Sequence, residues 1–475
     1  MNSINIRSAF EGFDLQYRTA ESKLVTRVYM DSAASTLALK PSQDVVREFL
    51  QYYSNTHSST HLGAKVSTEV VRWAERRIRS FVGADDSYIT VFMGSGSTLP
   101  LNRIAEGLAQ ARPTKTVVLA SIMEHHSNDL PHRMHNQFVE YIPVLDEHGN
   151  FLGIQLENVR QLLEKHKGKV NYIAITGASN VSGHLTPIHD IAALAHAYDA
   201  LIVVDGAQLV AHSPVCMCPP ERDQAIDFFV FSGHKVYAPG SPGVLIGRKE
   251  IMLQMSPAFY GGGMVKSVSS FDFDVATDLF DKEHAGTLNV SGILAIATAV
   301  DFLAHVGMDK ILAEEKILVQ CLLDGLKTIP GMNIYPEGEF GERIGVVSFN
   351  IAGIPHELLS LMLNDFFGVA VRNDCFCAHP FVRECLSPML WDINESEVAL
   401  YRGMVRISLG LYSTQADVDY VINALETIVG NISFYRSQYE IQSVHNFVHK
   451  SFAERVEDYF DVNARVAKSF STYLY

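Results

Sequence analysis

Between residues 88 and 247 the chain repeats one pattern: a short apolar run, a loop of small and polar residues, and then a helical periodicity. Uninterrupted apolar runs of this length predict strands that are covered on both faces, as in a parallel sheet flanked by helices. Ligands of such sheets bind in the crevice beyond the C-terminal ends of the strands. The repeat therefore predicts an α/β fold whose functional groups gather at one edge of the sheet.

A single lysine, Lys235, follows the apolar run of DFFVFSGHK, residues 227–235. At the end of a buried strand its ammonium group would lie in the interior, where a charge is costly unless it is paired or loses its proton. A lysine in that setting is suited to form a Schiff base with an aldehyde cofactor. The alternative is a side chain that extends from the strand end into solvent.

A candidate phosphate site follows the strand-like run 88–93. The sequence there is GSGST, residues 94–98, and a helical pattern resumes after it. Glycines leave backbone N–H groups accessible, the hydroxyls of Ser97 and Thr98 add donors, and the N-terminus of the next helix attracts an anion. The spacing matches neither the Walker loop nor the dinucleotide-binding fingerprint. The alternative is an ordinary strand-to-helix turn rich in Gly and Ser.

Further strand ends carry groups that suit a planar ring. His125 follows the strand-like run 117–120, and an imidazole there can stack on a ring or transfer a proton. Asp205 follows another run, and a carboxylate at the end of a buried strand needs a cation. For a pyridine ligand that cation is the protonated ring nitrogen, and Gln208 or Asn180 can bind the ring oxygen.

Two other places carry candidate substrate ligands. Asn55 and His57 lie in the polar loop SNTHSSTHLG, which either lines a site or forms a solvated turn. Arg406 interrupts the apolar run 404–412, and its forked guanidinium suits recognition of a substrate carboxylate. The alternative for Arg406 is an internal ion pair.

Size and composition narrow the class of protein. The chain has 475 residues, enough for two domains, and a formal net charge of −15, without the basic clusters of nucleic-acid-binding proteins. It shows neither the layout of a signal peptide nor an apolar run of the roughly 20 residues that a membrane helix needs. We therefore expect a cytoplasmic protein with no nucleic-acid or membrane partner. The six cysteines are expected as reduced thiols, and their C-x-C spacing is not that of a zinc site, so no metal is expected.

Changes of pattern along the chain predict four parts. Residues 1–28 form an N-terminal arm, 29–295 a large domain, 296–430 a smaller α+β domain, and 431–475 a C-terminal extension. The extension has helical periodicity but no catalytic motif, and we expect it to pack on the body or on a partner subunit. The strand-like runs of the smaller domain are 345–351, 369–372 and 404–412.

As a set, the motifs resemble the class V aminotransferase family of fold-type I pyridoxal phosphate enzymes, and within it the cysteine desulfurases and selenocysteine lyases. FSGHK is similar to the family's lysine motif, VVDGAQ to its aspartate motif, MEHH to its histidine motif, SNVSG to its asparagine motif and GSGST to its phosphate loop. The resemblance covers about residues 29–430. It implies a large α/β domain with a mostly parallel sheet, a smaller C-terminal domain, and pyridoxal 5′-phosphate as cofactor.

The resemblance also implies roles for individual residues. Lys235 is similar to the Schiff-base lysine, Asp205 to the partner of the pyridine nitrogen, and His125 to the residue over the ring. Arg406 is similar to the arginine that binds the substrate carboxylate. Thr287 resembles the residue that reaches the phosphate of the neighbouring subunit, which implies a homodimer. The remaining cofactor residues implied are Asn180 and Gln208 near the ring and Ser97, Thr98, Ser232 and His234 around the phosphate.

Cys377, in CFCAHP, falls on the position of the sulfur-accepting cysteine of the desulfurases. The resemblance implies that L-cysteine becomes L-alanine, that Lys235 moves the Cα proton, and that Cys377 carries the sulfur as a persulfide, which a sulfur-acceptor protein can receive. Cys375 is the alternative acceptor, or it resolves the persulfide, and either cysteine can instead be buried and inert. The alternative function keeps the cofactor in an aminotransferase, β-lyase or epimerase, with Cys377 structural.

Overall fold

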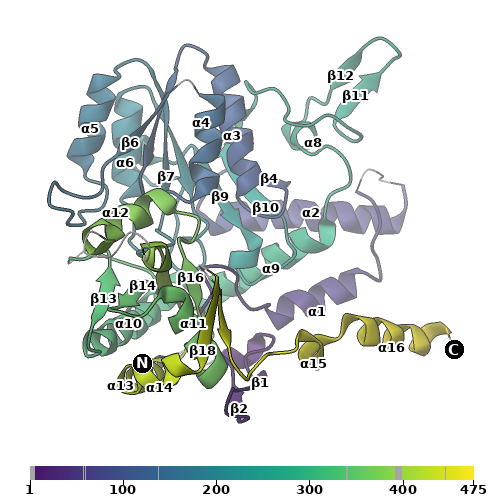
Figure 1. The fold of residues 1–475 in the computed structure, drawn as a ribbon. Coiled ribbons are helices and arrows are strands. Elements are labelled where there is room, and N and C mark those ends of the chain that lie inside the picture. The colour runs from purple at the N-terminus through teal and green to yellow at the C-terminus, as the bar shows by residue number, and fades with distance from the viewer. Residues whose placement is uncertain are drawn as a thin grey trace.

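The structure is a computed structural model that describes residues 6–474 except 57, 59, 137, 339–340, 391–397 and 444–445. It contains a large seven-stranded sheet flanked by helices and a smaller four-stranded sheet with its own helices (Figure 1). The predicted fold class, an α/β large domain with a smaller α+β domain, is confirmed.

The large sheet has the strand order β4-β10-β9-β8-β7-β5-β6. Every neighbouring pair from β9 to β6 is parallel, and β10 runs antiparallel to both β9 and β4. The carboxyl ends of the parallel strands therefore share one edge, as expected from the repeat. The strands are β4 (Tyr88–Met93), β5 (Val117–Ser121), β6 (Phe138–Ile142), β7 (Val170–Thr176), β8 (Leu201–Asp205), β9 (Phe228–Ser232) and β10 (Gly243–Arg248).

Alternate residues of these strands enter two separate cores, which is why the apolar runs are uninterrupted. Ile173 of β7 faces a core shared with α2 (Leu62–Phe81) and α9 (Val290–Val306). Its neighbour Tyr172 faces a core shared with α3 (Thr98–Ala111). Helices thus cover both faces of the sheet (Figure 1). The other helices of this part are α1 (Lys40–Phe49), α4 (Leu130–His135), α5 (Leu156–Lys165), α6 (Ile188–Ala197), α7 (Lys249–Met252) and α8 (Leu279–Glu283).

The smaller sheet is antiparallel, in the order β13-β14-β17-β16. Two of its predicted strands differ in the structure. The run 369–372 is divided, because β15 (Val369–Ala370) pairs in parallel with β3 (Val28–Tyr29) near the start of the chain. The run 404–412 ends as a strand at residue 408. The elements are β13 (Met332–Tyr335), β14 (Val346–Ile351), β16 (Arg372–Asp374), β17 (Met404–Ser408), α10 (Met308–Lys327), α11 (His356–Phe367), α12 (His379–Leu390) and α13 (Gln415–Gly430).

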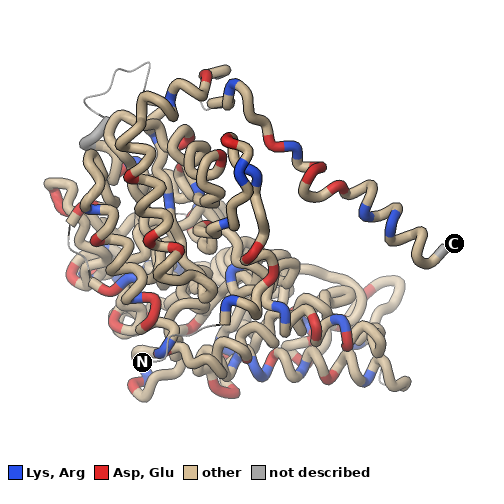
Figure 2. The backbone as a smooth tube through the Cα atoms, turned by 90° about the horizontal axis from the view of Figure 1, so that it is seen from below, with Lys and Arg blue, Asp and Glu red and all other residues tan. Residues whose placement is uncertain are grey.

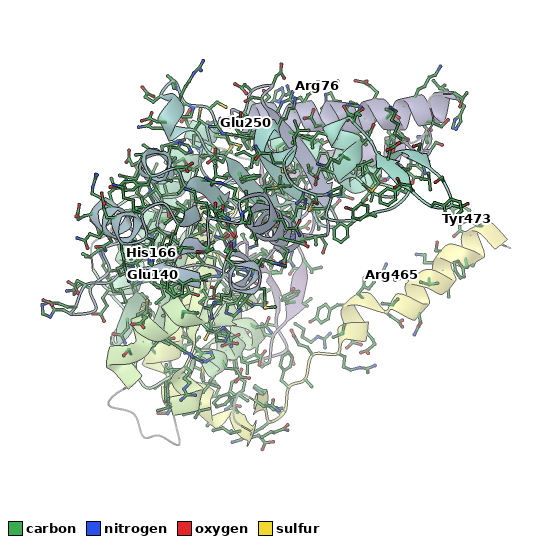
Figure 3. The ribbon with its side chains drawn as sticks, turned by 90° about the horizontal axis from the view of Figure 1, so that it is seen from above. Arg76, Glu140, His166, Glu250, Arg465 and Tyr473 are labelled. Atoms are coloured by element: carbon green, nitrogen blue, oxygen red, sulfur yellow. The ribbon has the colours of Figure 1, made fainter. Side chains whose placement is uncertain are left out.

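The C-terminal extension is anchored at its start and projects at its end. Its hairpin, β18 (Tyr439–Ser443) and β19 (Asn446–His449), places Tyr439 and Phe447 in the core of the smaller domain. Beyond α15 (Val456–Phe460), the helix α16 (Val462–Leu474) stands apart from the body (Figures 1 and 3).

No single helix among the described residues is long and apolar enough to cross a membrane; α9 and α10 meet that test only as a pair, with a bend of 78° between them.

Candidate active site

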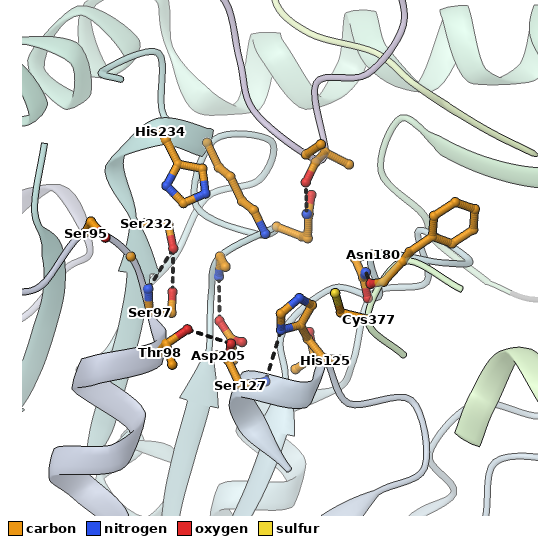
Figure 4. A pocket seen from close by; sticks show the side chains of 18 of the residues that line it. Ser95, Ser97, Thr98, His125, Ser127, Asn180, Asp205, Ser232, His234 and Cys377 are labelled. Atoms are coloured by element: carbon orange, nitrogen blue, oxygen red, sulfur yellow. Dashed lines mark hydrogen bonds between the residues drawn. The ribbon is translucent and has the colours of Figure 1, made fainter. Parts of the chain in front are cut away.

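A cavity of about 470 Å³ lies beyond the carboxyl ends of β5, β7, β8 and β9, where the smaller domain faces the large sheet (Figure 4). Most of the predicted site residues line it. They are Ser97, Thr98, His125, Asn180, Asp205, Gln208, Ser232, His234, Lys235, Cys377 and Arg406.

Lys235 is the last residue of a short 3-10 helix that follows β9, and its side chain is half-buried. Burial lowers the pKa of its amine; the Asp205 carboxylate opposes this shift and the Arg406 guanidinium adds to it. Among the described residues its amine has no hydrogen bond or ion pair. A lowered pKa increases the fraction of neutral, nucleophilic amine, so this position suits bond formation with an aldehyde.

Asp205 is the last residue of β8 and His125 lies in the turn after β5, and a backbone N–H donates to each side chain. Asp205 is buried, and one carboxylate oxygen accepts a hydrogen bond from the backbone N–H of Ala207 at 3.0 Å. His125 Nδ1 accepts the backbone N–H of Ser127 at 3.1 Å. Burial, followed by the Lys235 charge, lowers the pKa of His125 to about 3, so its ring is neutral over the physiological range.

The GSGST turn forms a polar cradle at the N-terminus of α3. The hydroxyl of Ser232 accepts the backbone N–H of Ser97 at 2.9 Å and lies 2.8 Å from the Ser97 hydroxyl. A hydrogen bond of 2.8 Å joins the hydroxyl groups of Thr98 and Ser127 (Figure 4). A Cβ atom at Gly96 would lie 3.2 Å from the His234 ring, so the glycine keeps the cradle open. Backbone donors, hydroxyls and a helix N-terminus together form a site suited to an anion.

Gln208 and Asn180 both line the cavity and donate to backbone carbonyls. The Gln208 amide donates to Ala33 at 2.7 Å, and the Asn180 amide donates to Phe376 at 2.8 Å. The second bond joins the loop after β7 to the loop of the smaller domain that carries the cysteines. Asn180 therefore connects the two domains as well as lining the cavity.

The two cysteines of CFCAHP differ in environment. Cys377 is exposed and lines the cavity, whereas Cys375 is buried and its thiol donates to the carbonyl of Arg402 at 3.2 Å. Burial, followed by the Asp374 carboxylate, raises the pKa of Cys375 to about 12. A thiol with so high a pKa stays protonated and is a poor nucleophile.

Arg406 is buried in β17 and reaches the cavity under the ring of Phe376, at 4.7 Å from its centroid. Its Nη1 donates to the carbonyl of Asn180 at 3.0 Å, and its Nη2 lies 3.4 Å from Asp31. Burial lowers the pKa of Arg406 to about 10, which Asp31 opposes. Its buried Nε has no partner among the described residues. The ion pair with Asp31 is loose at this distance, and the guanidinium lines the cavity.

Sequence reasoning missed one cation of the site. Arg372 is directly opposite Arg406 in the pairing of β16 with β17 and also lines the cavity. Its position at the end of the predicted strand 369–372 was the sequence feature that could have identified it as a site residue.

Asn55 and Thr287 do not line the cavity of their own chain; the Asn55 amide donates to the Thr287 hydroxyl at 3.1 Å. His57, the other predicted residue of that loop, lies outside the described residues.

The profile of the family described as aminotransferase class-V matches residues 28–421. The chain belongs to this family. Family members are pyridoxal-phosphate-dependent enzymes, and the resemblance inferred from the sequence motifs is confirmed.

Two relatives match nearly the whole of this class-V chain. One is described as a probable cysteine desulfurase, from Halalkalibacterium halodurans; it is 30% identical over 438 residues, which are 90% of this chain and 98% of the relative. The other is a cysteine desulfurase from Pectobacterium atrosepticum, 31% identical over 409 residues, which are 84% of this chain and 92% of the relative.

Solved structures agree with the class-V fold. The cysteine desulfurase CsdA of Escherichia coli superposes with a TM-score of 0.74 at 26% identity, covering 90% of this chain and 99% of that one. The apo cysteine desulfurase of Thermococcus onnurineus gives the same TM-score and identity, covering 85% of this chain and 95% of that one.

Proposed function

We propose that this chain binds pyridoxal 5′-phosphate and is a cysteine desulfurase, which converts L-cysteine to L-alanine and transfers the sulfur to Cys377. One observation carries the proposal. The half-buried Lys235, the buried and loosely paired Arg406, and the exposed Cys377 line the same cavity. The relatives and solved structures described as cysteine desulfurases support it.

The cavity has the donors and acceptors that pyridoxal phosphate requires. Within the described part of the chain, Asp205 accepts only the bond from Ala207, which leaves a carboxylate oxygen for a protonated ring nitrogen. The cradle of Ser97 and Thr98 suits the phosphate, and the Lys235 amine suits the aldehyde. The guanidinium of Arg406, which lines the cavity and is only loosely paired with Asp31, suits the carboxylate of an amino-acid substrate.

The cofactor, when bound, supplies an electron sink for the bonds at the Cα of an amino acid. Residues of the protein transfer the proton, orient the substrate and balance the charge of the cofactor ring. Lys235, whose lowered pKa favours the neutral amine, accepts and returns the Cα proton. Arg406 orients the substrate carboxylate, and the neutral ring of His125 covers one side of the cavity. Asp205 balances the positive charge of a protonated pyridine.

In the sulfur-transfer step, the Cys377 sulfur forms a bond to the substrate sulfur while the substrate's Cβ–S bond breaks. The electron pair of the broken bond stays with the carbon fragment, which takes up a proton and leaves as alanine. The cysteine sulfur is oxidised to a persulfide and the substrate carbon is reduced, so no external oxidant is needed. The exposure of Cys377 also suits delivery of the sulfur to an acceptor protein, whereas Cys375 is buried.

Mass spectrometry after incubation of the cofactor-loaded protein with L-cysteine tests this proposal. We expect alanine in solution and a mass gain of one sulfur atom on the peptide that contains Cys377. Cys377→Ser should abolish that gain and Cys375→Ser, a matched substitution two residues away, should retain it. Transamination or elimination of L-cysteine by the Cys377→Ser variant at the wild-type rate would instead support an aminotransferase or β-lyase.

We further propose that the protein is a cytoplasmic homodimer. All six cysteines are free, which suits a reducing compartment. Thr287 lies outside its own cavity, beside Asn55, and is available to a neighbouring subunit. The apolar side chains of α16 are exposed: Val462 by 60%, Val466 by 44% and Phe470 by 57%. An isolated helix of this length is marginally stable in water, so a covering surface is needed.

The charge of α16 also favours a second copy of this chain as the partner that covers the helix. The helix α16 contains Arg465 and Lys468 and no acidic residue, whereas the whole chain carries a net charge of −15 (Figure 2). A second copy therefore offers an electrostatically favourable surface. Light scattering should give twice the mass of one chain, and Phe470→Asp with Val466→Asp should weaken the dimer. A monomeric wild-type protein at micromolar concentration would exclude the dimer.

A further inference from the structure

The loop that carries Cys377 has an unusual backbone. Asp374, Phe376 and Cys377 all have positive φ angles, of 93°, 51° and 56°. Non-glycine residues adopt such angles at an energetic cost, and they persist only where surrounding contacts impose them. The contacts that hold this loop are therefore important for the position of the Cys377 sulfur.

Two of these contacts are made by the loop backbone to the large domain. The backbone N–H of His126, after β5, donates to the carbonyl of Cys377 at 2.8 Å. The amide of Asn180, after β7, donates to the carbonyl of Phe376 at 2.8 Å. Both acceptors are peptide carbonyls, so these bonds do not depend on which side chains the loop carries.

The third contact joins two imidazole rings across the same boundary. His379, the first residue of α12, stacks on His126 with ring centroids 4.8 Å apart and an interplanar angle of 13°. Its Nδ1 lies 3.0 Å from Nε2 of His126, and its backbone N–H donates to the same nitrogen at 3.5 Å. With Nε2 of His126 as the acceptor of the backbone N–H, the ring contact requires the tautomer of His379 that has its proton on Nδ1.

We propose that His379 is a positioning residue, whose contact with His126 completes a clamp that holds the Cys377 loop over the cavity. The inference rests on the proposed function, because it assigns the clamp to sulfur transfer. His379 does not line the cavity, so it is not expected to contact substrate. Its loss should therefore slow transfer of sulfur to Cys377 and leave the binding of L-cysteine unchanged.

The variants His379→Ala and His379→Asn distinguish the loss of the Nδ1 donor from other effects of replacing the histidine. Asparagine places an N–H donor close to the position of Nδ1, whereas alanine removes it. His148→Ala is the control, because the His148 side chain is 75% exposed and lies beside the carboxylate of its neighbour Glu147. All three proteins are compared with the wild type for their unfolding midpoints before other measurements.

Hydrogen exchange of the peptide spanning 375–380 reports on the clamp without requiring activity. We expect exchange about tenfold faster in His379→Ala, the effect of losing roughly one hydrogen bond, and near wild-type exchange in His379→Asn and His148→Ala. In the cofactor-loaded enzyme, kcat for persulfide formation should fall about tenfold in His379→Ala with KM unchanged.

Three results would overturn the clamp: wild-type exchange in His379→Ala, equal defects in the alanine and asparagine variants, or a change in KM with kcat unaltered. A wild-type protein that forms no persulfide would overturn the proposed function instead, and with it the assignment of the clamp to sulfur transfer. The exchange rates would still decide whether His379 holds the loop.

Discussion

A buried ion pair connects the phosphate cradle to the segment that carries Thr287. Arg103 lies on α3, whose first residue is Thr98 of the cradle, and Glu283 is the last residue of α8. Two parallel bonds of 2.8 Å join them, from Nε to Oε2 and from Nη2 to Oε1. The exposed fractions of the two side chains are only 2% and 0%. Solvent therefore cannot replace either partner.

Removing one partner of this pair leaves an uncompensated charge in the core. Breaking a buried ion pair in this way costs about 3–5 kcal/mol. We expect Glu283→Gln, which keeps one acceptor oxygen, at the lower end, with a loss of about 3 kcal/mol in the free energy of unfolding. The double variant Arg103→Met with Glu283→Leu replaces the pair by apolar side chains and should lie within about 1 kcal/mol of the wild type.

Urea denaturation, followed by fluorescence at constant salt, measures both differences. Asp44→Asn is the matched control, because it breaks the Arg47–Asp44 pair, whose side chains are 78% and 68% exposed. An exposed pair contributes at most about 1 kcal/mol. If Glu283→Gln cost no more than Asp44→Asn, or if the double variant were as unstable as the single one, the reasoning from burial would be refuted.

Three further predictions follow from other parts of the structure. Burial lowers the pKa of His132 to about 4, below its value of 6.5 in an unfolded chain, so stability should fall as pH falls through this window. His132→Asn should reduce that slope by up to about 1.4 kcal/mol per pH unit in urea titrations; an unchanged slope would contradict the assignment. Asp205→Asn should weaken pyridoxal phosphate binding by about tenfold to a hundredfold in absorbance titrations, and equal affinity would exclude a pyridinium partner. Deleting residues 462–474 should weaken self-association in light scattering, and an unaltered dimer would exclude α16 from the interface.

The groups at the strand ends were predictable because burial and turn chemistry are local properties of the sequence. An apolar run followed by Asp205 or Lys235 places each charge at the same edge once the strands are parallel. The partners of those groups were not predictable in this way. The loose pair of Arg406 with Asp31 joins residues 375 positions apart, and no periodicity connects them.

The pairing of strands that are far apart in the sequence was not predictable either. The run 369–372 has the composition of one strand, yet the pairing of Val369 with Val28 draws its first part away from the smaller sheet. Which edge a short strand joins depends on where the start of the chain lies in space. That position is a property of the whole fold, so local propensity does not report it.

By itself, the sequence determined the succession of buried strands, the chemical groups that end them and the family of the enzyme, since each is carried by contiguous residues. The tertiary structure alone decided that Cys375 is buried while Cys377 faces the cavity, and that His379 meets His126. Those outcomes depend on how the smaller domain packs against the large sheet. Such packing is set by the sum of many long-range contacts, to which no single motif corresponds.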